Sequence, residues 1–180
     1  MERIYSVDDI QRHTNASYLP KELLVDRVLL SDGFIPFVVH KDLEVLHLGS
    51  STRLSSERAV WERVFTLEAL KDLTFWSIKD FRGIIRPVYT SPLSTVLKRL
   101  RLDGLDFCDD NLLLFGKSLS FLVNLKSVAI EQKYGDIKNE RMFARIIGSL
   151  MHSLVFQKNL SKLLIGGHRV ALLEDFQTCV

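Results

Sequence analysis

The 180-residue chain has only two cysteines, and they lie far apart in the sequence. Cys108 and Cys179 form no CxxC pair and give no framework of disulfides, so we expect a reducing compartment, the cytoplasm or the nucleus. The first residues, MERIYSVDDIQRH, include early acids and lack the apolar core of a secretory signal. These absences argue against a small secreted domain held together by disulfides.

Long hydrophobic runs and an excess of one charge sign are also lacking. The longest apolar stretch, residues 144–156, is interrupted by polar residues. It is shorter than the roughly 20 residues that a bilayer crossing needs. The net charge is +2, which gives no sign of a strongly basic surface. We therefore expect neither a membrane nor a nucleic acid as partner.

Signatures of catalysis and of metal binding are absent from the sequence. The five histidines do not form HExxH or a Cys/His spacing that suits zinc, and there is no GxSxG or GxxxxGK[ST] motif. Cys108 lies close to Asp106, Asp109 and Asp110, which disfavour a thiolate. We expect no enzyme activity, no cofactor and no metal site.

A six-residue phrase with apolar first, fourth and sixth positions occurs five times in the chain. The copies are LEVLHL at 43–48, LKDLTF at 70–75, LKRLRL at 97–102, LKSVAI at 125–130 and LSKLLI at 160–165. Side chains alternate between the two faces of a strand, so the fourth and sixth positions point the same way. Five such strands stacked in parallel would share one core, which the 47% hydrophobic composition can supply.

The segments between the phrases should return the chain, mostly as helices. Residues 55–69 carry an apolar helical stripe after Ser55 and Ser56, which suit a helix start. Two further helices are expected, one from Asp109 onward and a longer one over residues 139–156. Pro87 and Pro92 break any long helix in residues 79–95, where we expect loop and short turns.

The phrase and its spacing of 27 to 28 residues resemble the leucine-rich repeat family, in the longer class represented by ribonuclease inhibitor. The resemblance covers about residues 40–180. It implies an α/β solenoid of about five repeats with a parallel concave sheet and convex helices. Three residues after each phrase the family usually has asparagine or cysteine, whereas this chain has Ser51, Ile78, Leu105, Lys133 and His168. We therefore expect degenerate repeats with irregular turns.

The first forty residues suggest an additional element. Pro20 suits the first position of a helix, and the apolar residues up to Leu30 predict a helix that ends at Ser31-Asp32-Gly33. We interpret residues 1–36 as a helical cap on a repeat domain of residues 37–180, because a repeat stack needs its open end covered.

An alternative interpretation of the same segment gives it a partner. The string YLPKELLVDRVL resembles the F-box and related adaptor-binding helices of substrate receptors in cullin-type ubiquitin ligases. The resemblance implies adaptor contacts at Leu19, Pro20, Leu23, Leu24 and Val28.

The third, fifth and seventh positions of the phrases should face away from the core, on the concave side. Tryptophan and arginine are enriched among residues that dominate protein interfaces, and both occur there. The candidate partner-binding residues are Trp76, Arg99, Arg101, Asp72, Asp103, Glu131 and His47. The alternative is a solvated charge lattice, in which Arg99 pairs with Asp72 and Arg101 with Asp103 or Glu131.

The expected function is protein–protein recognition without catalysis. Two other readings stay open at this point. One borrows from leucine-rich proteins that stimulate small GTPases through an acidic concave surface. The other is an enzyme, which would need a pocket with converging polar groups.

Overall fold

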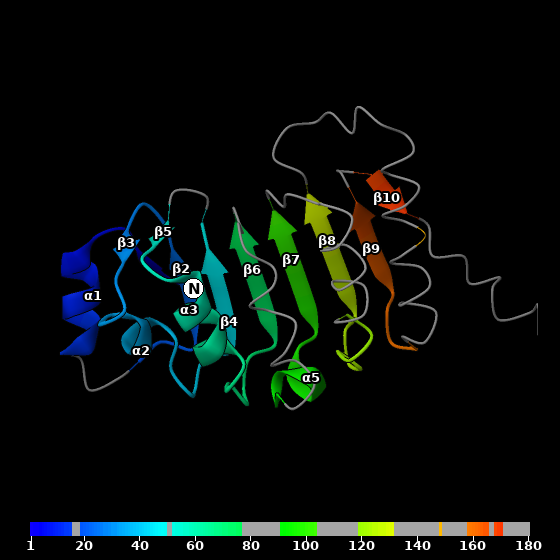
Figure 1. The fold of residues 1–180 in the computed structure, drawn as a ribbon, viewed down its shortest axis with the longest axis horizontal. Coiled ribbons are helices and arrows are strands. Elements are labelled where there is room, and N and C mark those ends of the chain that lie inside the picture. Colours follow the sequence, from blue (N-terminus) through cyan, green and yellow to red (C-terminus); the bar gives the residue numbers. More distant parts are fainter. Residues whose placement is uncertain are drawn as a thin grey trace, which may run out of the picture.

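An eight-stranded sheet runs through the described part of the chain (Figure 1). The computed structural model describes residues 1–15, 19–49, 52–76, 91–103, 119–131, 148, 158–165 and 168–170. The strands, in their order across the sheet, are β1 (Glu2–Ile4), β2 (Glu22–Val25), β4 (Val45–Leu48), β6 (Asp72–Trp76), β7 (Arg99–Asp103), β8 (Ser127–Glu131), β9 (Lys162–Ile165) and β10 (His168–Val170). The first seven are parallel and follow sequence order, and β10 is antiparallel to β9.

The five phrases pair in register, position by position. The fourth position of each phrase lies beside the fourth position of the next, as in Leu46 beside Leu73 and Leu73 beside Leu100. The fourth and sixth positions are buried, as predicted: Leu46, Leu48, Leu73, Phe75, Leu100, Leu102, Val128, Ile130 and Leu163. The side chain of Ile165 lies outside the described residues. The prediction of a parallel sheet built from the phrases is confirmed.

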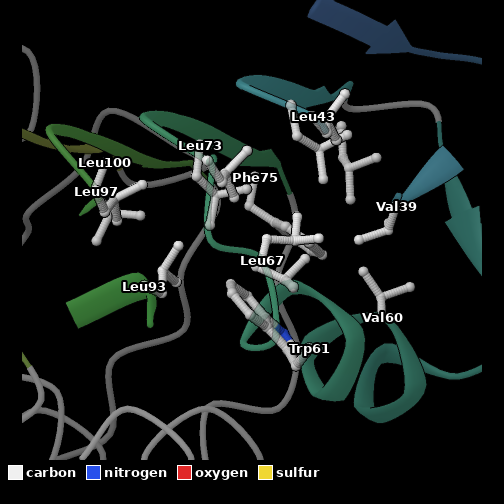
Figure 2. Close-up of a cluster of buried hydrophobic side chains, with 14 of the residues drawn as sticks. Val39, Leu43, Val60, Trp61, Leu67, Leu73, Phe75, Leu93, Leu97 and Leu100 are labelled. Atoms are coloured by element: carbon white, nitrogen blue, oxygen red, sulfur yellow. The ribbon is translucent and has the colours of Figure 1, made fainter. Parts of the chain in front are cut away.

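Helix α3 (Glu57–Val64) covers the apolar face of the sheet, where the sequence predicts a helix. It begins at Ser56, whose hydroxyl accepts a hydrogen bond from the N–H of Ala59 at 3.1 Å and so satisfies a free backbone donor. The predicted stripe is buried. Trp61 stacks on Phe75 of β6 with ring centroids 4.7 Å apart, and on Phe65 at 5.8 Å. Figure 2 shows Trp61 close to Leu67 beneath this part of the sheet.

Smaller elements complete the covering layer. They are α1 (Val7–Thr14), α2 (Ile35–Val38), α5 (Leu93–Val96) and a parallel pair of two-residue strands, β3 (Leu29–Leu30) and β5 (Arg53–Leu54). Ile10, Val38 and Leu93 from the three helices belong to the same buried cluster as the sheet. None of the helices in the described ranges combines the length and apolarity that a bilayer crossing requires.

Three predicted connections fall wholly or partly outside the described residues. Residues 91–96 form a turn and the single helical turn α5, whose N-cap is Pro92, in agreement with the short turns expected there. Residues 77–90 lie outside the description. So do the helix expected from Asp109 and, apart from residue 148, the helix expected over 139–156.

The helix predicted over Pro20–Leu30 is wrong. Residues 22–25 form β2, in which Leu23 lies beside Leu46 and Val25 beside Leu48. Residues 20–25, PKELLV, are therefore a further copy of the phrase with proline at the first position. Pairing with β4 buries Leu23 and Val25, and this tertiary gain outweighs the local preference for a helix start. Arg27 then turns the chain with a left-handed φ of 58°.

The N-terminal residues 1–36 thus add two strands, β1 and β2, to the edge of the sheet. Strands β1 and β2 come before residue 36 in the sequence, where the boundary of the repeat domain was expected, and β4 comes after it. All three strands belong to the same sheet. The helix of this region is α1, before β2, and Figure 1 shows it at the end of the molecule beside β3.

Alanine substitutions at Leu23 and Leu24 distinguish a strand from a helix in this segment. In β2, Leu23 points into the core and Leu24 toward the other face. We expect Leu23→Ala to lower the free energy of unfolding by about 2–5 kcal/mol, and Leu24→Ala by less than about 1 kcal/mol. Urea unfolding followed by circular dichroism measures both. Equal losses would contradict the strand, because a helix places both residues on its apolar side.

The stack of Trp61 on Phe75 makes a second prediction. Trp61→Ala should lower the free energy of unfolding by about 3–5 kcal/mol, because it leaves a cavity between α3 and β6. Trp61→Phe should cost much less, since the indole Nε1 has no hydrogen-bond partner among the described residues. The neighbouring exposed Glu62→Ala is the control, with a change within about 0.5 kcal/mol. A Trp61→Ala protein as stable as that control would show that α3 does not pack on the sheet.

Candidate partner-binding face

The face of the sheet opposite the core carries the third and fifth positions of the phrases. We name it the open face and define it by the described residues Glu22, Leu24, Val45, His47, Asp72, Thr74, Arg99, Arg101, Ser127, Ala129, Lys162 and Leu164. The covering helices contact the sheet through the fourth and sixth positions, so these side chains point the other way. Most are exposed or half-buried, and only Thr74 and Ala129 are buried.

Three charged or polar side chains form a row across β4, β6 and β7. Asp72 stands in the middle, with its Oδ2 accepting a hydrogen bond from Arg99 Nε at 2.7 Å. Its Oδ1 lies 3.6 Å from His47 Nε2, an electrostatic contact beyond ordinary hydrogen-bond length. The side chains are 26% (His47), 14% (Asp72) and 62% (Arg99) exposed, so the carboxylate is the sheltered member and the guanidinium reaches solvent.

The environment of Asp72 favours its charged form. Burial alone raises the pKa of the carboxyl, but the interaction with the His47 ring and the hydrogen bond from Arg99 outweigh it. The pKa of Asp72 therefore lies below its ordinary value, and the carboxylate is a fixed negative charge that orients both neighbours.

The sheet brings the predicted site residues into neighbouring rows. Trp76, Asp103 and Glu131 lie side by side on β6, β7 and β8, but their side chains lie outside the described residues. Arg101 is half-buried, lies between Thr74 and Ala129 on the neighbouring strands, and is not an unpaired cation. The charge-lattice interpretation predicted that Arg99 pairs with Asp72, and this ion pair is present.

A second charged row, at the second position of the phrases, was missed by the sequence analysis. Glu44 bridges two lysines: Lys21 Nζ lies 3.1 Å from its Oε1, and Lys71 Nζ contacts its Oε2. Hydrogen bonds from Lys71 and Lys21 lower the pKa of Glu44. The signal was present in the sequence, because the second positions of the six phrases are Lys21, Glu44, Lys71, Lys98, Lys126 and Ser161. It can be interpreted only once the register of the strands is known.

Two asparagines form a short ladder that sequence reasoning also missed. Asn124 and Asn159 each stand directly before a phrase. The Nδ2 of Asn159 donates to the carbonyl of Val123 at 3.0 Å and to Asn124 Oδ1 at 3.4 Å, and Asn124 Nδ2 donates to the carbonyl of Thr95. These amides satisfy turn carbonyls at the amino ends of the strands, rather than three residues after the phrase, where asparagine was sought.

The residues proposed for adaptor binding are distributed through β2 and its flanks. Pro20, Leu23 and Val28 are buried, and Leu19 and Leu24 are half-buried. The carbonyl of Pro20 lies 3.0 Å from the Nε2 of the buried His40. The segment is a strand, so the helix on which the adaptor interpretation depends is not formed.

Comparison of the chain with protein-family models, with curated proteins and with solved structures found no match. Among the described residues, no three His, Cys, Asp or Glu side chains gather as metal ligands would. The open face is therefore the feature of the molecule from which a function can be inferred.

The Asp72 carboxylate should make stability depend on pH. Its pKa is lower in the folded state, so the contribution is present above about pH 4, the ordinary value, and is lost as the pH falls toward the lowered value. We expect Asp72→Asn to be less stable than wild type by roughly 1–3 kcal/mol at pH 7, with the difference shrinking below about pH 4. Urea unfolding between pH 3 and 7 measures this.

The matched variant is Arg99→Gln, which removes the charged partner of Asp72. It should keep part of the pH dependence, since His47 remains beside the carboxylate. A difference between wild type and Asp72→Asn that stays constant from pH 3 to 7 would contradict the lowered pKa.

Proposed function

We propose that this chain is a non-catalytic protein–protein interaction module of the leucine-rich repeat type, which binds a protein partner on its open face. The observation that carries the proposal is the in-register display of polar and charged side chains on the open face of six hydrogen-bonded parallel strands, β2, β4 and β6 to β9. Such a display is rigid, so a partner can be bound with little loss of conformational entropy in the receptor.

The repeat interpretation is supported by the alignment of six phrases in one sheet, including the copy at residues 20–25. Equivalent positions are neighbours throughout, as a repeat with a constant unit requires. The segment between the second and third of these phrases returns through α3 on the apolar side. In this proposal the open face is the concave face of the repeat stack.

Binding is favoured over catalysis by the way the polar groups are used. Asp72 is paired with Arg99 and lies beside the His47 ring, and Glu44 is held by two lysines, so these carboxylates act as ion-pair partners rather than as free bases. Arg99 keeps most of its surface exposed, and arginine is among the residues that dominate interfaces. The two widely separated cysteines fit a cytoplasmic or nuclear setting.

Site-specific photo-crosslinking tests the location of the partner. A photoreactive amino acid is placed at Ser127, between Arg99 and Lys162 on the open face, and separately at the exposed Arg58 on α3. In lysate of the source cells, we expect one protein to crosslink at Ser127 and not at Arg58, with unmodified protein competing for it. Crosslinking of the same protein at Arg58 alone, or at both positions equally, would place the partner elsewhere than on the open face.

A further inference from the structure

The amino ends of β7, β8 and β9 gather lysines on one side of the molecule. We name Lys98, Lys126 and Lys162 the lysine cluster; each begins or directly precedes one of these strands, and Lys158 lies four residues before Lys162. All four side chains are exposed. Within the described residues, no carboxylate lies in ion-pair contact with them.

In the other half of the same edge, the acids of the phrases are ion-paired. Glu22 contacts the N-terminal amine at 3.3 Å, and Glu44 takes both Lys21 and Lys71. Asp72 pairs with Arg99 and lies 3.6 Å from the His47 ring. In the phrases of β7 to β9 no acid holds an equivalent position, so Lys98, Lys126 and Lys162 have no such partner there.

The lysines are held close together by the backbone. The N–H of Lys98 donates to the carbonyl of Lys71 and that of Lys126 to the carbonyl of Lys98, both at 2.8 Å, so these residues stand on adjacent rows. Lys98 and Lys126 hold the same position in adjacent phrases, where strands are about 4.8 Å apart and like charges facing each other destabilise the sheet, and Lys162 lies one residue further along, beside Ser127. A negatively charged ligand would relieve this repulsion.

Asp103 and Glu131 belong to the opposite ends of β7 and β8 from the lysine cluster. Asp103 is four residues beyond Arg99 on β7, which at about 3.3 Å per residue is roughly 13 Å along the strand. Glu131 holds the same position on β8. At that separation, exposed charges are screened by salt under physiological conditions.

The surroundings of the cluster favour a protein ligand over a nucleic acid. Val123, at the turn before Lys126, is 52% exposed, and Ala129 and Leu164 form an apolar floor on β8 and β9. Single-stranded nucleic acid binds on aromatic platforms. Among the described open-face side chains of β7 to β9, none is aromatic.

We infer that the lysine cluster binds an acidic segment of the partner protein, with aspartate or glutamate side chains on Lys98, Lys126 and Lys162 and an apolar side chain near Val123. This inference rests on the proposed function and specifies the chemistry of the partner. It also places the negative segment at the amino ends of β7 to β9, at one end of the face rather than over its centre.

The test uses a fluorescein-labelled peptide of ten glutamates and fluorescence anisotropy at low salt. The binding variant is Lys98→Glu with Lys126→Glu and Lys162→Glu. The control is Lys41→Glu with Arg53→Glu and Arg58→Glu, three exposed cations outside the cluster. Each triple changes the formal net charge by six, from +2 to −4. Circular dichroism checks folding, and a triple Lys→Gln variant of the cluster serves if the reversal unfolds the protein.

We expect the cluster variant to weaken peptide binding by about tenfold or more and the control to weaken it by less than about threefold. Equal weakening by both triples would reduce the effect to net charge and overturn the inference, as would failure of the wild type to bind the peptide. If a ten-nucleotide thymidine strand binds more tightly than the peptide through the same lysines, the ligand of the cluster is a nucleic acid and the inferred acidic protein segment is wrong. Crosslinking at Ser127 is independent of these results, so the proposed function can stand if this inference fails.

Discussion

The constraint on which the structure depends is the main-chain register of the parallel strands. It is set by a repeated pattern in which one carbonyl, at the second position of a phrase, accepts two hydrogen bonds from the next phrase. The carbonyl of Glu44 takes the N–H groups of Lys71 and Asp72, and the carbonyl of Lys71 takes those of Lys98 and Arg99. The carbonyls of Lys98 and Lys126 repeat the pattern toward β9. A slip by one residue would move every core side chain to the other face, so burial of the leucines and these hydrogen bonds enforce the same register.

Strong alternation made the five phrases predictable, and weak local signals made the sixth unpredictable. In PKELLV, proline followed by Lys-Glu and adjacent leucines reads as a helix start, and only pairing with Leu46 and Leu48 decides otherwise. Proline is tolerated there because the ladder donors seen in the later phrases begin at the second position, so the first position needs no N–H for the ladder. The start of α3 was predictable, because a capping serine precedes a clear apolar stripe.

The contacts on the open face could be predicted only in part, because some of them depend on side-chain directions and on the strand β2. Arg99 and Asp72 occupy the same position in neighbouring phrases, so their pairing follows from the spacing of the repeats. The contact of His47 with Asp72 is diagonal, from a fifth position to a third, and depends on side-chain directions that the sequence does not specify. The bridging of Glu44 between two lysines depends on β2 being a strand, since Lys21 reaches it only in that register.

The proposed binding role is supported most strongly by a difference between the two halves of the sheet edge. The acids Glu22, Glu44 and Asp72 are ion-paired in one half, whereas the lysines of β7 to β9 have no acid at an equivalent position. If the charges served only solubility, pairing each lysine with an acid in the next phrase would lower the repulsion at no cost to the core, and Glu44 shows that the repeat permits it. From Lys98 onward that arrangement stops, although backbone spacing and register continue unchanged. Local departures from the most stable choice are typical of functional surfaces. The proposed acidic ligand would account for the lysines at β7 to β9, which make no ion pair within the described residues.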